Sequence, residues 1–173
     1  MATLEIVKYP DPRLKEVCSE VSEFNSDLEQ FLRNMADTMY AAHGIGLAGP
    51  QVGFMYRVTV IDVSEERNDL LYLVNPEIVE ASGSTNSEEG CLSIPGYRDT
   101  VKRHEEIVCK AMNPKGEEFT IEADGLLAIC IQHEIDHLDG ILFIDRMSRL
   151  KREMFRRWCK KHYNPNPQPP ANG

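Results

Sequence analysis

Apolar side chains recur every three or four residues between positions 28 and 39, which is the spacing of an amphipathic helix. Ser26 and Glu29 match a capping box at the start of this stretch, and Gly44 follows it as a stop signal. We therefore predict a first helix from about Asp27 to His43, with its apolar face packed in the core.

A second, central helix is predicted after Asp124, the residue that we expect to cap its N-terminus. Residues 125–129 form an apolar entry, and Gly140 is expected to end the helix. A helix this apolar should be buried, so polar side chains on it are expected to face an interior cleft.

Segments rich in β-branched and aromatic residues, separated by turn residues, predict strands. These segments are residues 56–63, residues 70–74 and 78–81 with Asn75 and Pro76 between them, and a hairpin over residues 105–123. Residues 4–24 read as an extended arm because their prolines exclude a helix interior. The expected fold class is α+β, with antiparallel β-sheets around the central helix and a further helix at the C-terminus.

That last helix is expected in a strongly basic segment. Residues 146–162 carry eight Lys or Arg against one acid, so the net charge of −9 divides into +7 here and −16 on the rest of the chain. Met147, Leu150, Met154 and Trp158 fall on one stripe, which favours a surface helix packed on the domain. Alternatively, the basic face could bind ribosomal RNA, because clustered Lys and Arg attract phosphates.

Length and composition predict one domain in a chain of 173 residues. We expect the domain to span residues 1–162, with 146–162 as its basic C-terminal helix, and a proline-rich, disordered tail at 163–173. The sequence has no run of 18 apolar residues and no secretory or import signal, which predicts a cytoplasmic protein that does not contact membranes. The five Cys include no Cys-x-x-Cys pair, as is typical of reduced thiols.

The central helix contains a His-Glu-x-x-His motif at His133, Glu134 and His137. Residues four apart lie on one helix face, so both imidazoles can reach one metal ion while Glu134 stays beside it. A metal-activated water next to a carboxylate is the chemistry of a hydrolase. The competing interpretation is polar residues on an ordinary amphipathic helix, but a chain of 173 residues with 5 His seldom contains this motif by chance.

A catalytic metal site needs a third protein ligand and one open position. Cys130 lies on the same helix, but it stands roughly 10 Å along the axis from His137, and three ligands in one axial row cannot readily meet one ion. His104 and His162 sit in charged surface contexts, and Asp139 or Asp145 would suit a harder ion. By elimination, Cys91 is the preferred third ligand, and Cys130 is interpreted as a wall of the site.

A loop over residues 44–53 contains four glycines and one proline. Such a loop cannot continue a helix, and it lets the backbone approach a ligand closely. Gln51 is the polar side chain in it, and its amide could donate a hydrogen bond toward a neighbouring site.

Three motifs together resemble those of the peptide deformylase family. They are Gly44-Ile45-Gly46-Leu47-Ala48-Gly49-Pro50-Gln51, Glu89-Gly90-Cys91-Leu92-Ser93 and Gln132-His133-Glu134-Ile135-Asp136-His137, in that order. The resemblance covers roughly residues 4 to 150. The family removes the formyl group from the N-formylmethionine that starts bacterial and organellar polypeptides, so the resemblance implies nascent N-formylmethionyl chains as substrates. We expect the single catalytic domain to be a monomer.

The resemblance also assigns roles to individual residues. It implies that Cys91, His133 and His137 bind one divalent metal ion and that Glu134 is the general acid and base. It further implies that Gln51 and the backbone N–H of Leu92 hold the oxyanion, that Gly46 aligns the substrate backbone, that Arg98 lies near the substrate chain, and that Ile45, Ile94, Leu126, Ile129 and Cys130 shape the methionine pocket.

The resemblance suggests ferrous iron as the metal, although Cys with two His also accepts zinc, nickel or cobalt. One position departs from the family, which commonly has alanine where this chain has Gly49. A glycine there is expected to loosen the loop that carries Gln51.

Two other functions remain open. A metallopeptidase that cuts ordinary peptide bonds also uses the His-Glu-x-x-His motif. A ribosome- or RNA-binding protein without catalytic activity could carry a structural metal, but such a site takes four protein ligands, and the sequence offers three good ones.

Overall fold

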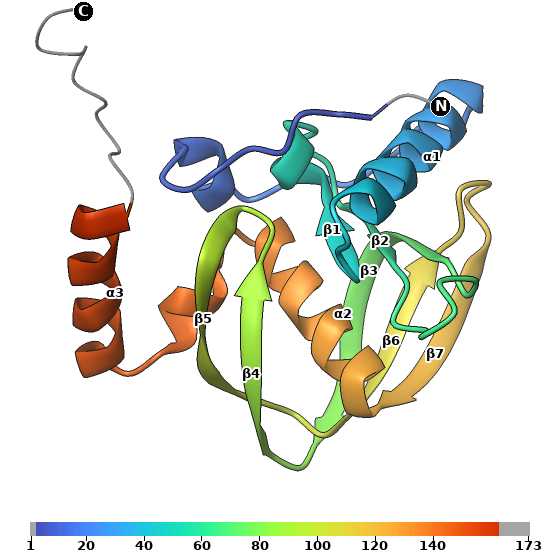
Figure 1. Cartoon of the computed structure of the whole chain (residues 1–173). Helices are drawn as coiled ribbons and strands as arrows, with labels where there is room; N and C mark the ends of the chain where they lie inside the picture. The colour runs from blue at the N-terminus through green and yellow to red at the C-terminus, as the bar shows by residue number, and fades with distance from the viewer. Residues whose placement is uncertain (1–2, 163–173) are drawn as a thin grey trace, which may run out of the picture.

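A five-stranded antiparallel sheet curves around one side of helix α2 (Gly125–Leu138) in the computed structural model, which describes residues 3–162 (Figure 1). The strand order is β1-β2-β3-β6-β7, and each neighbouring pair is antiparallel. The strands are β1 (Gly46–Ala48), β2 (Val58–Ile61), β3 (Leu71–Ser82), β6 (Glu106–Met112) and β7 (Glu118–Asp124).

A separate two-stranded ribbon, β4 (Thr85–Cys91) and β5 (Ile94–Arg103), lies on the other side of α2 (Figure 1). The predicted α+β class with antiparallel sheets around a central helix is therefore confirmed. The ribbon itself was not predicted, because residues 85–91 contain no alternation of apolar and polar side chains.

Every residue of helix α2 from Cys130 to Leu138 is buried, as expected for a helix this apolar. Asp124 occupies the N-cap position as expected, but its side chain accepts no capping hydrogen bond. The stop at Gly140 is confirmed: its φ is +74°, and a Cβ there would lie 2.4 Å from the carbonyl oxygen of Lys15. Only glycine fits this exit from the helix.

Helix α1 (Ser26–Ala41) packs the predicted apolar face, including Leu32 and Met35, against β2. The predicted cap was wrong by one residue. The Asn25 side chain, not Ser26, accepts the hydrogen bond from the backbone N–H of Leu28, at 3.0 Å. The helix also ends before the predicted His43, which itself takes the left-handed conformation expected of a glycine.

The two strands predicted on either side of Asn75 and Pro76 are one strand, β3, with an irregularity. Asn75 has a φ of +50°, and its side chain bonds both the N–H and the C=O of Val21, at 2.8 and 2.9 Å. The strand continues past Pro76 because the pairing is irregular at this point, so the ladder does not need the backbone N–H that proline lacks. The hairpin predicted over residues 105–123 is confirmed as β6 and β7.

Helix α3 (Arg149–His162) stands at the edge of the molecule against β5 (Figure 1). The predicted apolar stripe was wrong in part, because the side chains of Leu150 and Met154 are exposed. Phe155 and Cys159 are the buried residues of the helix instead. The predicted disordered tail at 163–173 lies outside the described residues.

Three short 3-10 helices complete the fold: η1 (Pro12–Lys15), η2 (Gly49–Val52) and η3 (Phe143–Arg146). All five cysteines are free thiols, as expected. Within residues 3–162, no helix has the length and apolarity needed to cross a bilayer.

Candidate metal centre

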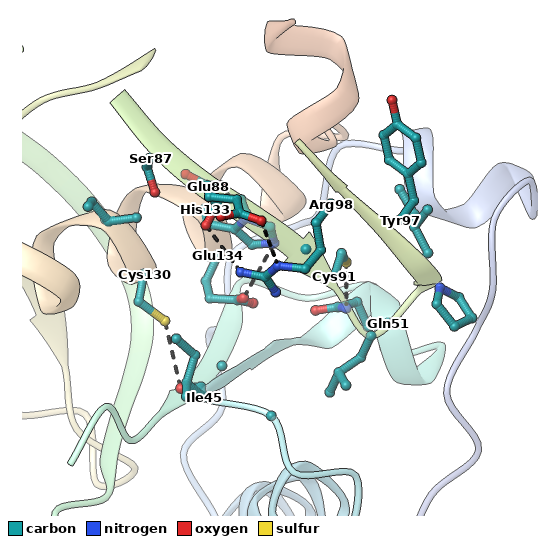
Figure 2. Close-up of a pocket in the computed structure, with 18 of the residues that line it drawn as sticks. Ile45, Gln51, Ser87, Glu88, Cys91, Tyr97, Arg98, Cys130, His133 and Glu134 are labelled. Carbon is teal, nitrogen blue, oxygen red and sulfur yellow. Dashed lines mark hydrogen bonds and ion pairs between the residues drawn. The ribbon is translucent and has the colours of Figure 1, made fainter. Parts of the chain in front are cut away.

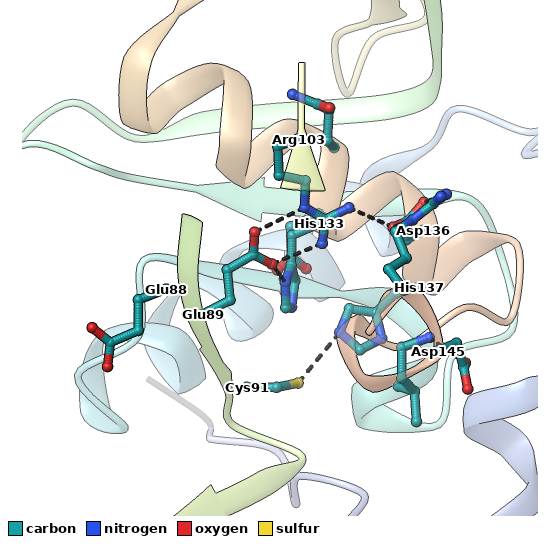
Figure 3. A network of polar contacts seen from close by, with 12 residues as sticks. Glu88, Glu89, Cys91, Arg103, His133, Asp136, His137 and Asp145 are labelled. Atoms are coloured by element: carbon teal, nitrogen blue, oxygen red, sulfur yellow. Dashed lines mark hydrogen bonds and ion pairs between the residues drawn. The ribbon is translucent and has the colours of Figure 1, made fainter. Parts of the chain in front are cut away.

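Cys91, His133 and His137 come together between the end of β4 and the C-terminal half of α2 (Figure 3). One ligand atom from each lies within 4.8 Å of the others, and Cys91 Sγ is 3.4 Å from His137 Nε2. A sulfur and two imidazole nitrogens in this arrangement suit a divalent transition metal and leave a coordination position open. Burial lowers the pKa of His137 well below its usual range, which keeps that imidazole in the neutral form that binds metals.

Glu89 fixes the orientation of His133. Its Oε1 atom lies 2.8 Å from His133 Nδ1, and both of its oxygens accept hydrogen bonds from Arg103, at 2.7 and 2.8 Å (Figure 3). Burial raises the pKa of Glu89, but the hydrogen bonds from Arg103 and His133 outweigh it and lower that pKa to about 2. Glu89 is therefore a carboxylate that accepts from the ring of a metal-ligand candidate.

His133 itself is shared between Glu89 and Cys91. Burial lowers the pKa of this imidazole, but hydrogen bonds to Cys91 and Glu89 raise it to about 10. His133 thus holds a proton where it contacts Glu89 and Cys91. A metal ion bound by His133 and Cys91 would take the place of that proton.

The buried charges continue beyond Glu89 as a chain of ion pairs. Arg103 also donates to Asp136 at 2.7 Å, and Asp136 accepts two hydrogen bonds from Arg146 at 2.6 and 2.7 Å. The Arg103 side chain is 2% exposed, so it depends on both carboxylates for its solvation. This network ties the metal-site strand β4 to α2 and η3.

Glu134 is buried beside His133, with Oε1 3.9 Å from His133 Nε2. Its Oε2 atom has no hydrogen-bond partner among residues 3–162, and burial raises the pKa of the carboxyl group to about 7. A carboxyl group with a pKa near neutrality can both accept and return a proton.

Gly46 lies directly against Glu134, at the start of β1. A Cβ atom there would stand 2.9 Å from both Glu134 Oε1 and Cys130 Sγ, so a larger residue would displace one of these two side chains. Cys130 donates instead to the carbonyl oxygen of Ile45, at 3.7 Å, and is not among the ligand candidates that cluster in the described part of the chain. Its interpretation as a wall of the site agrees with this position.

Gln51 is held firmly in η2. Its Oε1 accepts from the backbone N–H of Ala48 at 2.9 Å, while Nε2 donates to Ser93 Oγ at 3.1 Å and approaches Cys91 Sγ at 3.4 Å. The effect of Gly49 on this loop stays a prediction. Gly49 is buried, and a Cβ on it would lie 2.4 Å from the carbonyl oxygen of Phe54.

A cavity of about 550 Å³ opens beside this cluster and is lined by all of the predicted site residues except His137 (Figure 2). Leu126 and Ile45 are exposed at its rim, whereas Cys130 and Ile94 are buried in its wall. Cys130 and Ile45 come from α2 and the segment before β1, while Arg98 comes from β5. The predicted residues therefore surround one pocket although they come from three regions of the sequence.

Some lining residues were not predicted, namely His43, Gly44, Ser87, Glu88, Glu89, Gly90, Pro95, Gly96 and Tyr97. Arg98 reaches back to Glu88, with Nε 3.5 Å from Glu88 Oε1 and a hydrogen bond of 3.3 Å to its carbonyl oxygen. Both side chains are largely exposed, so this pair contributes little stability and leaves a charged edge on an otherwise apolar mouth.

The chain matches known proteins along most of its length. A family model described as "Polypeptide deformylase" matches residues 3–153. The sequence is 54% identical over 162 residues to the peptide deformylase of Thermodesulfovibrio yellowstonii, covering 92% of this chain and 98% of that protein. It is 50% identical over 161 residues to the peptide deformylase of Pseudoalteromonas translucida, covering 93% and 96%.

Solved structures show the same likeness. A crystal structure of a peptide deformylase from Legionella pneumophila matches with a TM-score of 0.88 and 46% identity, covering 93% of this chain and 95% of that one. One from Ehrlichia chaffeensis in complex with actinonin matches with a TM-score of 0.87 and 37% identity, covering 95% and 100%.

Proposed function

The chain belongs to the peptide deformylase family, and from that premise we propose that Cys91, His133 and His137 hold one divalent metal ion while Glu134 carries the proton of the reaction. The activity is hydrolytic removal of the N-formyl group from the formylmethionine of newly made polypeptides, with release of formate. The donor set fits the metal that the family requires.

When bound, the ion supplies a Lewis acid that lowers the pKa of water and polarises the formyl carbonyl. Glu134 takes a proton from the attacking water and returns it to the departing amine. Gln51 Nε2 and the backbone N–H of Leu92 donate hydrogen bonds to the formyl oxygen as negative charge develops on it. Gln51 is suited to this role because its amide is already fixed by Ala48 and Ser93.

The substrate peptide lies along the open edge of β1, where Gly46 allows its backbone to approach Glu134. Arg98 contributes a positive charge at the mouth of the pocket, beside the path of the substrate chain. The methionine side chain enters the pocket formed by Ile45, Ile94, Leu126, Ile129 and Cys130.

One geometric relationship favours this function: three ligand atoms gather beside a buried carboxyl group whose pKa is about 7, at the wall of an open pocket. A purely structural metal takes four protein ligands, whereas the described residues bring three together here. A general metallopeptidase would share the metal chemistry but would cut internal peptide bonds.

Formate release separates these activities. Protein prepared without air should release formate from a formyl-Met-Ala-Ser peptide and leave both peptide bonds intact. Cys91→Ala should lose bound metal and formate release together, whereas Cys18→Ala, a buried thiol away from the pocket, should keep both. Cleavage of the internal bonds, or full activity of Cys91→Ala, would contradict the proposed function.

We propose ferrous iron as the metal, with zinc, nickel and cobalt as the alternatives that the same ligands accept. Metal analysis of protein purified without air, with formate release measured on the same sample, identifies it. Iron predicts activity that is lost on exposure to air and regained on reloading with ferrous iron under reductant. Stable activity in air with zinc bound would contradict iron.

A second proposal concerns contact with the ribosome through α3. Its outward surface carries Arg149, Arg157, Lys160 and Lys161, which make no ion pair with any residue between 3 and 162. Leu150 and Met154 are exposed on the same helix. These cations could bind the phosphates of ribosomal RNA, and the apolar side chains beside them could bind a groove on a ribosomal protein.

Charge neutralisation tests this contact better than removal of the helix, because removal would also take away the buried Phe155. Replacing the four outward cations by Gln should weaken co-sedimentation with ribosomes, and the loss should be largest at low salt. Formate release from a free peptide should not change. Equal sedimentation of both proteins at every salt concentration would contradict ribosome contact.

We further propose that the protein acts as a monomer in the cytoplasm, where nascent chains emerge. Among residues 3–162, the exposed large apolar side chains are spread over the N-terminal arm, the segments before β1 and β2, β3, α2 and α3. Sedimentation equilibrium at micromolar concentration would detect a stable dimer.

A further inference from the structure

Ser87 is an unusual residue in the wall of the pocket. It is 8% exposed and is the only Ser or Thr among the lining residues, and its hydroxyl makes no hydrogen bond with any residue between 3 and 162. Its oxygen is not among the fully buried polar atoms that lack a partner in the described residues, so it is accessible from the pocket and can bond water or a ligand there.

The alternation of β4 places Ser87 on the same face as Glu89 and Cys91. Glu89 is fully paired with Arg103 and His133, and Cys91 belongs to the metal cluster. Ser87 lies two residues beyond Glu89, about 7 Å farther from the metal site at the usual strand rise. It is thus the inward-facing β4 residue that neither the metal cluster nor the ion-pair network uses.

Helix α2 runs past the same space. One turn before His133 are Ile129 and Cys130, and one turn earlier is Leu126, at about 5.4 Å per turn. Figure 2 shows Ser87 and Cys130 at one end of the pocket and Cys91 at the other, with His133 and Glu134 between them. Ser87 therefore faces the part of the pocket assigned to the substrate side chain.

No other side chain in this part of the pocket offers a bound substrate the hydrogen-bond donor that the Ser87 hydroxyl offers. Ile45, Leu126 and Ile129 are hydrocarbon, and the Cys130 thiol is directed to the carbonyl oxygen of Ile45. If the first side chain of the substrate is entirely apolar, it displaces water from the Ser87 hydroxyl and offers no hydrogen bond in return. A side chain with an acceptor near its end would pair with the hydroxyl instead.

We propose that Ser87 is a specificity-determining residue whose hydroxyl donates a hydrogen bond to the end of the substrate's first side chain. It favours the methionine thioether, a weak acceptor, over the hydrocarbon of norleucine. It also lets the pocket take methionine sulfoxide, whose oxygen is a strong acceptor, so that formylated chains with an oxidised first residue are substrates. This inference rests on the proposed deformylase function.

Three peptides that differ only in the first side chain test the inference: formyl-methionyl, formyl-norleucyl and formyl-methionine-sulfoxide. In Ser87→Ala, the ratio of kcat/KM for the sulfoxide to that for norleucine should fall about tenfold, and the methionine-to-norleucine ratio about two- to threefold. The loss should fall mainly on KM, because the hydroxyl contacts the side chain and not the reacting carbonyl.

Ser82→Ala, an exposed serine at the end of β3, is the matched control and should keep both ratios. Ser87→Thr keeps a hydroxyl and should retain most of the sulfoxide preference if the donor causes it. Equal ratios in the parent protein, Ser87→Ala and Ser87→Thr would overturn the role of Ser87 while leaving the deformylase function intact. Failure of the parent protein to release formate from any of the three peptides would overturn the function itself.

Discussion

His133 Nδ1 lies 2.8 Å from Glu89 Oε1, and this contact decides which ring nitrogen can face a metal ion. An imidazole that donates from Nδ1 to a carboxylate keeps Nε2 as its lone-pair nitrogen. Glu89 can hold this position because Arg103 binds both of its oxygens.

Replacing Glu89 by Ala should therefore weaken metal binding by about 10- to 100-fold. It should also lower the free energy of unfolding by about 3 to 5 kcal/mol, since Arg103 would lose one of its two buried partners. Competition with a chromophoric chelator and urea unfolding measure the two effects. Glu88→Ala is the matched control, because the neighbouring side chain is 70% exposed; a similar loss in both variants would contradict the role of Glu89.

Glu134→Gln should retain the metal and lose turnover. The amide has nearly the same shape as the carboxyl group but cannot accept the proton, so kcat should fall by at least about 100-fold. Metal content and formate release measured on the same sample test this, with Glu122→Gln on the exposed face of β7 as a control. Substantial activity in Glu134→Gln, or loss of metal in step with activity, would rule out a proton-transfer role.

Part of the metal centre could be read from local spacing, and part could not. His133, Glu134 and His137 follow from helical geometry, and Cys91 follows from the need for a third ligand. Glu89 could not be assigned, because its partners His133 and Arg103 are distant in the sequence and meet only when β4 packs on α2. One signal was present: Glu89 precedes Cys91 by two residues, so in a strand they share a face.

The errors in the predicted fold also arise where tertiary contacts decide between local alternatives. Asn25 and Ser26 are adjacent capping residues, and local sequence does not decide between them. In α3, one stripe through Leu150 and Met154 and another through Phe155 and Cys159 both fit a helix period. Packing against Tyr97 and Tyr9 selects the aromatic stripe, and that partner surface is not visible in the helix sequence.

Asp62 should make stability depend on pH in the acid range. Burial raises its pKa, but hydrogen bonds from Ser64, Tyr40 and the backbone of Asp69 outweigh it and lower the pKa from 3.8 to about 2. A pKa lowered by folding means that the contribution of Asp62 is fully present above about pH 4 and is lost as the pH falls toward 2. Its backbone N–H also bonds the carbonyl oxygen of Ile45 at 2.9 Å, at the rim of the pocket.

Asp62→Asn should thus be less stable than the parent protein at pH 7, and the difference should shrink as the pH falls from 4 to 2.5. Urea unfolding at several pH values measures this, with Asp37→Asn, at a half-buried position of α1, as the control. A difference that stays constant over this range would show that the ionised form of Asp62 is not what stabilises the fold.

Phe155 couples α3 to the rim of the substrate pocket. Its ring lies 4.8 Å from that of Tyr97 and 5.3 Å from that of Tyr9, centre to centre, and the residue is 2% exposed. Tyr97 belongs to the β5 segment that lines the pocket. Loss of the Phe155 ring therefore removes support from the rim without touching Glu134 or the metal ligands.

Phe155→Ala should lower the free energy of unfolding by about 3 kcal/mol, at the low end for a buried phenylalanine because α3 is a peripheral helix. It should raise KM for a formyl-Met peptide more than it lowers kcat, since binding at the rim weakens while the reacting groups stay in place. Met154→Ala removes a side chain that is 55% exposed on the adjacent position and should change stability by less than about 0.5 kcal/mol. Equal stability of the two variants in urea unfolding would mean that α3 is not anchored through Phe155. If Phe155→Ala is destabilised but its KM is unchanged, this packing does not support the rim of the substrate pocket.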